Sequence, residues 1–322
     1  MRTTSISLNS HRTTAQALAV HLLTPKIQTT KASEEQLRIH VDNLAGYLRN
    51  PEHTTELNDS GDYIKNIWKD LGLKVKENAF IVNNDDYGVT GLGIQEFRNL
   101  SISFGPEKGE RFIIGAHYDV FGNQPGADDN ASGVAGLLEL ARLMKENNVK
   151  PKIPIDLVAY TLEENPYSLL GSRVHAAELK KTRTRVKGMI SLEMIGYYSS
   201  DPNSQSLPLK LMSLIYPTVG NFICIAGYGN SFSLTRRVST SIRNHGGIPS
   251  HRLWVPFSCL VSDLRRSDHA SFSDLGFPAC IVTDTSFMRN KNYHTIFDRP
   301  ETLDFTKMAQ VVDGVFGLVK KM

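Results

Sequence analysis

The sequence predicts an α/β fold in which helices cover both faces of a largely parallel sheet. Short apolar runs of strand length alternate with segments whose apolar residues recur at helical spacing. Polar residues directly follow several of these runs, at the place where such sheets carry their functional sites. The chain of 322 residues is 40% hydrophobic and 21% charged, which is typical of a globular protein and excludes disordered, collagen-like and coiled-coil classes.

The chain is expected to form one domain behind an N-terminal extension. Residues 1–32 are rich in Thr, Ser and Gln and show no sustained hydrophobic period, which is typical of a tail. No Pro-, Gly- or Ser-rich linker divides the remainder, so residues 33–322 are assigned to a single domain.

Two helices are predicted at the start of this domain. Ser33 can cap the first helix, with Gln36 in the capping-box position and Leu37 at the start of the apolar face. The second helix is predicted to follow Ser60 and to close at Gly72.

The rest of the domain is predicted to be strands with a helix among them. Bounded apolar runs indicate strands at 74–82, 97–104, 112–114, 155–160, 189–192 and 279–282. Between the third and fourth of these, a helix is indicated by apolar residues on one face, namely Val134, Leu137, Leu138 and Ala141. This alternation favours the α/β class.

Charge, hydropathy and cysteine content indicate which partners, which cellular location and which cross-links are to be expected. The 36 Lys and Arg residues against 33 Asp and Glu give a net charge of +3, too small to indicate a nucleic-acid partner. No apolar run reaches the roughly 18 residues of a membrane helix. The apolar patch at residues 15–23 is interrupted by Gln16 and His21, so we expect a cytoplasmic protein, with secretion as the alternative. Three cysteines, an odd and sparse set, argue against a disulfide framework.

Histidines and carboxylates follow four of the predicted strands. They are His117, Asp119, Asp128, Asp129, Glu163, Glu164, Glu193 and His294. Any one of them alone is most simply a polar loop residue. Together they form a ligand set for zinc or a similar divalent metal, and the surplus of carboxylates suggests two ions. Cobalt and manganese are not separated from zinc by this pattern.

Several linked motifs make the assignment more specific. They are His117-Tyr-Asp119, Pro125-Gly-Ala-Asp-Asp-Asn-Ala-Ser-Gly133, Glu163-Glu164, Gly171-Ser-Arg173, Ser191-Leu-Glu-Met194, Ser267-Asp-His-Ala-Ser-Phe272 and Tyr293-His-Thr295. In these motifs and in their order, the chain over about residues 35–318 resembles the co-catalytic zinc aminopeptidase family. That family includes secreted bacterial leucyl aminopeptidases, glutamate carboxypeptidase and the glutaminyl cyclases. The resemblance implies a three-layer α/β/α sandwich around a mixed, largely parallel central sheet.

The resemblance also implies a set of metal ligands, with two zinc ions per chain. His117 and Glu193 would hold one ion, Glu164 and His294 the other, and Asp129 would bridge them. The peptide bond after Asp129 is expected to be cis.

Other roles follow from the same resemblance. Glu163 would be the general base on the attacking water. Asp119 would accept the second ring N–H of His117 and fix its tautomer. Ser267 is expected as a partner of His294.

Substrate contacts are assigned less directly. The leucyl aminopeptidase branch carries an oxyanion-binding Tyr where this chain has Leu264, so another donor is needed here. Arg266, Phe287 and Tyr293 are candidates for binding a peptide or small amide substrate, with structural or core roles as the alternative.

The resemblance implies a dizinc metallo-exopeptidase, most simply an aminopeptidase. One alternative is a glutaminyl cyclase-like transferase, which operates one zinc ion, and another is a non-catalytic homologue. The complete ligand set, the presence of Glu163 and the Asn at position 130 favour the peptidase. The sequence does not indicate residue preference or oligomeric state.

Overall fold

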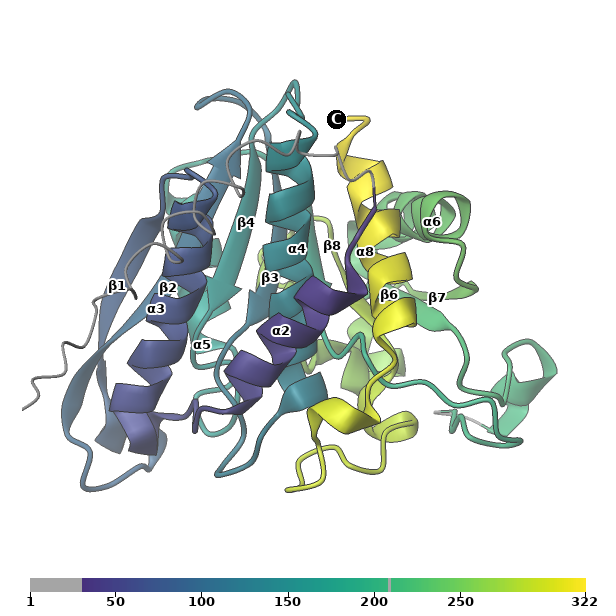
Figure 1. Cartoon of the computed structure of the whole chain (residues 1–322), viewed down its shortest axis with the longest axis horizontal. Coiled ribbons are helices and arrows are strands. Elements are labelled where there is room, and N and C mark those ends of the chain that lie inside the picture. Colours follow the sequence, from purple (N-terminus) through teal and green to yellow (C-terminus); the bar gives the residue numbers. More distant parts are fainter. Residues whose placement is uncertain (1–30, 208–209) are drawn as a thin grey trace, which may run out of the picture.

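A computed structural model describes residues 31–207 and 210–322 (Figure 1). Eight strands join in one sheet with the order β1-β2-β4-β3-β5-β8-β6-β7. The strands are β1 (Lys76–Asn83), β2 (Ile94–Phe104), β3 (Arg111–His117), β4 (Ile155–Tyr160), β5 (Val186–Leu192), β6 (Ile223–Tyr228), β7 (Ser250–Val255) and β8 (Ala279–Thr283).

The centre of the sheet is parallel and its flanks are mixed. Strand β3 pairs in parallel with both β4 and β5, and β5 pairs in parallel with β8. Strand β2 is antiparallel to β4, and β6 is antiparallel to β8. The four central strands therefore end at the same edge of the sheet, so residues that follow them are brought together.

Helices cover both faces of this sheet. One face carries α2 (Glu34–Ala45), α3 (Thr54–Asp70), α4 (Gly133–Glu146), α6 (Phe232–Ser241) and α8 (Phe305–Val319), whose apolar residues form the main core. Most of these helices lie in front of the sheet in Figure 1. The other face carries α5 (Leu170–Lys181) and α7 (His269–Ser273), which pack on a second core around Ile113 and Tyr160. The three-layer α/β/α sandwich is thus confirmed.

Element boundaries depart from the sequence prediction in informative ways. Ser33 accepts the N–H of Gln36 at 3.2 Å, as a capping residue does, and β4 has the predicted bounds. Helix α3 begins at Thr54 rather than after Ser60, whose buried hydroxyl donates to Leu57 O within the helix. The first turns of α3 are largely polar, so hydrophobic spacing does not mark them.

Three further predictions concern the cysteines, a membrane-spanning helix and the N-terminal extension. The three cysteines are free, and Cys280 is buried. Across the two described stretches, no helix is long and apolar enough to cross a membrane. The predicted N-terminal extension lies, except for its last two residues, outside the described residues.

Candidate metal centre

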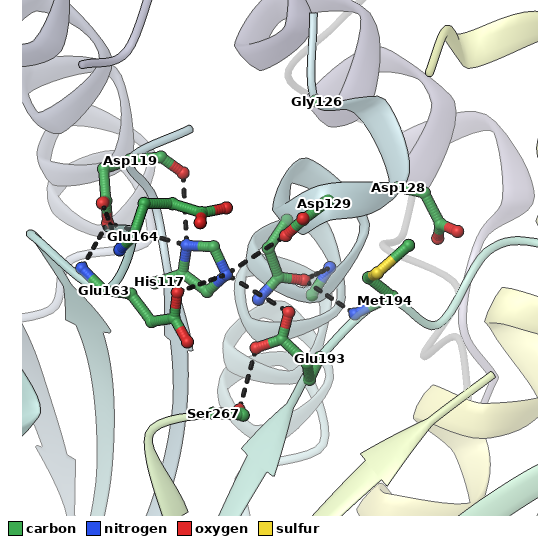
Figure 2. Close-up of polar contacts among 12 residues, drawn as sticks. His117, Asp119, Gly126, Asp128, Asp129, Glu163, Glu164, Glu193, Met194 and Ser267 are labelled. Atoms are coloured by element: carbon green, nitrogen blue, oxygen red, sulfur yellow. Dashed lines mark hydrogen bonds and ion pairs between the residues drawn. The ribbon is translucent and has the colours of Figure 1, made fainter. Parts of the chain in front are cut away.

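The predicted ligands come from loops at the carboxyl edge of the central strands (Figure 2). His117 is the last residue of β3, and Glu193 follows β5 directly. Glu163 and Glu164 follow the end of β4, and Asp129 lies in the loop that precedes α4. Residues far apart in sequence therefore converge on one site because their strands are parallel.

Asp129 lies between two histidines. Its Oδ1 is 3.4 Å from Nε2 of His117, and its Oδ2 is 3.0 Å from Nε2 of His294. The peptide bond between Asp129 and Asn130 is cis, as expected. One carboxylate thus presents an oxygen to each histidine, which is the arrangement that a bridging ligand requires.

Each histidine also faces a glutamate. Nε2 of His117 is 3.2 Å from Glu193 Oε1, and Nε2 of His294 is 3.2 Å from Glu164 Oε1. These contacts pair the residues as the resemblance implies. Glu163 lies slightly farther away, with Oε2 3.9 Å from Nε2 of His117.

The distances between donor atoms also define two groups that differ from the pairs described above. In each group, the donor atoms are close enough together to bind one metal ion. In the first group, donor atoms of His117, Asp129 and Glu164 lie within 4.8 Å of one another. In the second group, the same holds for donor atoms of His117, Glu163 and Glu193. Both groups are buried and share His117. The five side chains of these two groups therefore form one connected set of donors rather than two separate sites.

The electrostatics of the site fit bound cations. Burial raises the pKa of Glu164 to about 7, and it raises the pKa of Glu163 well above its usual value. Although burial alone would lower it, contacts with Asp129 and Glu164 raise the pKa of His294 to about 9. Four carboxylates share a site with little access to water, so positive charge is needed to keep them ionised. The donor set of imidazoles and carboxylates suits zinc.

Asp119 supports the site by a different contact from the predicted one. Nδ1 of His117 is 3.2 Å from the backbone oxygen of Asp119 and 3.6 Å from its carboxylate. The carboxylate instead accepts the backbone N–H groups of Glu163 and Glu164, each at 3.1 Å. Asp119 therefore orients the histidine mainly through its main chain and holds the two glutamates through its side chain.

Ser267 also has a different partner. The sequence predicts it beside His294, but its hydroxyl donates to Glu193 Oε2 at 2.9 Å, as Figure 2 shows. Ser191, on β5, lies 2.9 Å from the same hydroxyl. The short segment before α7 lies beside the end of β5, which places Ser267 behind the His117–Glu193 side of the site.

Asp298 and Asn130 make supporting contacts that the sequence does not predict. The carboxylate of Asp298 accepts the N–H groups of Asp128 and Asp129, each at 3.0 Å. Asn130 donates to Leu192 O at 2.9 Å and accepts the N–H of Met194 at 3.0 Å, which ties the Asp129 loop to the end of β5. The motif Ala127-Asp-Asp-Asn130 marks the position of Asn130, but no periodic signal marks Asp298.

Gly126 allows the chain to enter this loop. Its φ is +55°, and a Cβ at this position would lie 2.3 Å from Asp129 O. The buried guanidinium of Arg49 donates to the backbone oxygens of Pro125 and Gly126, each at 2.9 Å. A side chain at position 126 would therefore displace Asp129.

A largely apolar cavity adjoins the metal centre. Its inner end contains Asp129, Glu163, Glu164 and Glu193. Its floor is formed by β6, β7 and β8, which contribute Cys224, Ala226, Leu253 and Ile281. Arg266, Phe287 and Tyr293, the candidates for substrate contact, all line it, and so does Leu264.

Three of the side chains that line the cavity form a linked group beside His294. Arg266 donates to the hydroxyl of Tyr293 at 3.2 Å, and its guanidinium lies 4.9 Å from the ring centroid of Phe287. Tyr293 in turn stacks on His294, with centroids 3.8 Å apart. A substrate in the cavity would therefore lie close both to the metal ligands and to these polar groups.

Comparison with known proteins identifies a peptidase family and its members. Residues 99–319 match peptidase family M28. The uncharacterized protein YfbL of Escherichia coli (strain K12) is 39% identical over 301 residues, which cover 89% of this chain and 88% of YfbL. Leucine aminopeptidase 1 of Metarhizium robertsii is 31% identical over 221 residues, 65% of this chain and 51% of that protein. The chain thus spans about half the length of that leucine aminopeptidase.

Solved structures share the fold. LapB from Legionella pneumophila superposes with a TM-score of 0.67 at 21% identity, covering 89% of this chain and 71% of LapB. A glutaminyl cyclase from Bacteroides thetaiotaomicron has a TM-score of 0.68 at 18% identity, covering 91% and 99%. A Zn-dependent exopeptidase from Parabacteroides distasonis has a TM-score of 0.67 at 20% identity, also covering 91% and 99%. Since the family match extends over more than half of the sequence, this chain belongs to peptidase family M28 and is a metallopeptidase.

Proposed function

We propose that this metallopeptidase is a dizinc aminopeptidase. The observation that carries the proposal is the position of Asp129, whose two carboxylate oxygens face His117 and His294 separately. An ion on each side of Asp129 would then have one histidine and one oxygen of the shared carboxylate as ligands. Glu193 and Glu164 complete one donor group on each side.

Glu163 is the residue we assign as general base. It lies beside the donor set, lines the cavity and is buried. Bound zinc lowers the pKa of water from about 15.7 toward about 7 and polarises a carbonyl oxygen. The carboxylate of Glu163 takes the proton of the attacking water and then delivers it to the leaving amine. Burial raises the pKa of Glu163, so its carboxylate holds a proton more readily than an exposed glutamate does.

Tyr293 is the group we assign in place of the missing oxyanion tyrosine. Leu264 has no hydrogen-bond donor in its side chain, although it lines the same cavity. The hydroxyl of Tyr293 accepts a hydrogen bond from Arg266, so its own proton is free for a substrate carbonyl oxygen. Such a donor stabilises the negative charge that develops during attack.

The cavity supports a preference for large apolar N-terminal residues. Its floor side chains are apolar or weakly polar, and the sheet residues Ala226 and Ile281 come from paired positions of β6 and β8. Burying an apolar side chain there removes it from water at about 25 cal/mol per Å². Small residues such as Ala would gain less from the same cavity.

A panel of substrates tests the proposal with the zinc-loaded chain. We expect leucyl and phenylalanyl anilides to be cleaved at least tenfold faster than the alanyl anilide, and N-acetyl-leucyl anilide to resist cleavage. A peptide with N-terminal Gln should release free Gln. Formation of pyroglutamyl peptide would instead indicate the cyclase, and equal cleavage of the acetylated substrate would contradict an aminopeptidase.

A matched variant tests the cavity assignment. Ala226 is buried in the floor. Ala226→Phe should lower kcat/KM for the phenylalanyl anilide roughly tenfold while sparing the alanyl anilide, because the larger side chain occupies the volume that the substrate ring needs. An equal loss on both substrates would place the preference elsewhere.

A further inference from the structure

The imidazole of His294 is enclosed between two aromatic rings. The ring of Phe121 lies 4.2 Å from it with an interplanar angle of 4°, and the ring of Tyr293 lies 3.8 Å from it at 18°. Each near-parallel ring at this distance covers one face of an imidazole. Phe121 and Tyr293 therefore occupy opposite faces of His294.

The two metal-site histidines are oriented by different means. His117 has Nδ1 3.2 Å from the backbone oxygen of Asp119, the kind of contact that usually fixes a ligating histidine. Among the described residues, no hydrogen-bond partner is found for Nδ1 of His294, whose contacts are made through Nε2. Ring stacking therefore takes the place of an Nδ1 contact and acts together with the Nε2 contacts in orienting His294.

Phe121 is placed for this contact rather than for the core. Its side chain is 37% exposed, whereas the preceding Val120 is 2% exposed. Within the described chain, its aromatic contact is with His294. Phe121 is partly covered but belongs to none of the hydrophobic core clusters of the described residues, and the ring that it covers is that of His294.

The loop that carries Phe121 is fixed on both sides of it. The N–H of Val120 donates to Arg49 O at 2.8 Å, and the side chain of Asn50 donates to Gly122 O at 2.6 Å. The same loop begins at His117, the ligand on the other side of the site. A change in the stacking of Phe121 can therefore act on His294 without moving the chain around it.

We propose that Phe121 is a positioning residue, which holds His294 in the plane needed to bind the second metal ion. This inference rests on the proposed two-ion function. Stacking between rings contributes roughly 0.5–1.5 kcal/mol beyond area burial, which corresponds to about a 2- to 13-fold change in affinity. The effect should fall on the ion held by His294 and spare the ion held by His117.

Zinc titration of the chelator-stripped full chain against a competing dye tests this inference. Wild type should show two binding steps, and His294→Ala should lose one of them, which identifies that step. Phe121→Ala should weaken the identified step by about 3- to 10-fold and leave the other within about twofold. Phe121→Tyr keeps the flat ring and should match wild type, whereas Phe121→Leu should behave like the Ala variant.

Cobalt provides a second readout, since its visible absorption reports ligand geometry. The bands that His294→Ala removes should shift in Phe121→Ala and stay unchanged in Phe121→Tyr. Phe297→Ala is the matched control, because Phe297 is also exposed and close in sequence to His294 but has no ring contact in the described chain. Circular dichroism of the metal-free proteins checks that each variant is folded.

The possible results distinguish the positioning role of Phe121 from the two-ion proposal. Equal weakening of both steps in Phe121→Ala, or wild-type binding in both the Ala and Leu variants, overturns the positioning role while leaving two ions in place. A single binding step in wild type contradicts the two-ion proposal, and the positioning role then fails with it.

Discussion

The carboxylate of Asp298 accepts the backbone N–H of Asp129, with Oδ2 3.0 Å from the amide nitrogen. Its other oxygen accepts the N–H of Asp128. The carboxylate of Asp119 likewise accepts the backbone N–H groups of Glu163 and Glu164. Both acidic pairs of the site are thus held by an aspartate from a distant part of the chain, which accepts two consecutive amide groups.

Asp298→Asn should weaken this support without removing a metal ligand. The amide that replaces the carboxylate offers one oxygen, so one of the two N–H groups loses its acceptor and the Asp129 loop is less firmly held. Loss of such an outer partner typically costs about 10- to 100-fold in metal affinity, and we expect a loss in that range. Zinc titration measures it, with the exposed Asp201→Asn as control. Unchanged zinc affinity would show that Asp298 does not hold the loop.

Glu163→Gln should abolish turnover while leaving zinc content near the wild-type value. The amide cannot accept a proton, and general base catalysis typically contributes about 10²- to 10⁴-fold. Hydrolysis of leucyl anilide and metal analysis of the same sample check both parts. Retention of more than about a tenth of the wild-type rate would refute the assignment of Glu163 as base, because so small a loss lies below the range for this mechanism.

Tyr293→Phe separates the hydroxyl of this residue from its ring. The ring keeps its stacking on His294, so zinc binding should be preserved. Loss of a donor to the developing oxyanion should lower kcat by about 10²- to 10³-fold with a smaller change in KM. Steady-state kinetics on leucyl anilide give this split. A rise in KM with unchanged kcat would assign the hydroxyl to substrate binding alone.

The burial of His269 should make the stability of the folded chain decrease in mild acid. Burial lowers the pKa of His269 to about 4, below the 6.5 of an unperturbed histidine. As the pH falls from 6.5 toward 4, His269 binds a proton in the unfolded chain but not in the folded chain. The free energy of unfolding therefore decreases progressively below pH 6.5. The expected slope is about 1.4 kcal/mol per pH unit for this group.

Urea unfolding at several pH values measures this slope. A chelator is present throughout, because metal binding has its own pH dependence. His269→Gln should reduce the slope relative to wild type. Identical slopes in wild type and His269→Gln would exclude this residue as the source.

The central sheet could be predicted because its strands are short, mostly apolar runs. The run at 155–160 is buried at every position, and polar residues mark its end clearly. The start of α3 was misplaced because its first turns are polar and their contacts are tertiary. Hydrophobic periodicity reports burial, so it locates an element best where burial is complete.

The convergence of the candidate metal ligands could be predicted for a related reason. His117 and Glu193 stand at the ends of parallel strands, whose geometry the sequence pattern already implies. The partners of Ser267 and the role of Asp298 depend instead on how irregular loops fold over those ends. Phe121 is similar, since its single feature in the sequence is an apolar residue in a loop. Loop geometry has no period, and only the three-dimensional structure reveals it.

Metal analysis of the full chain, alongside Asp129→Ala, tests the central claim most directly. The two oxygens of Asp129 face both histidines, so this one substitution should affect both ions. The account predicts about two equivalents of zinc in wild type, and loss of zinc and anilide cleavage together in the variant. A wild type with one equivalent, or an Asp129→Ala protein that keeps both ions, would contradict a dizinc site bridged by Asp129.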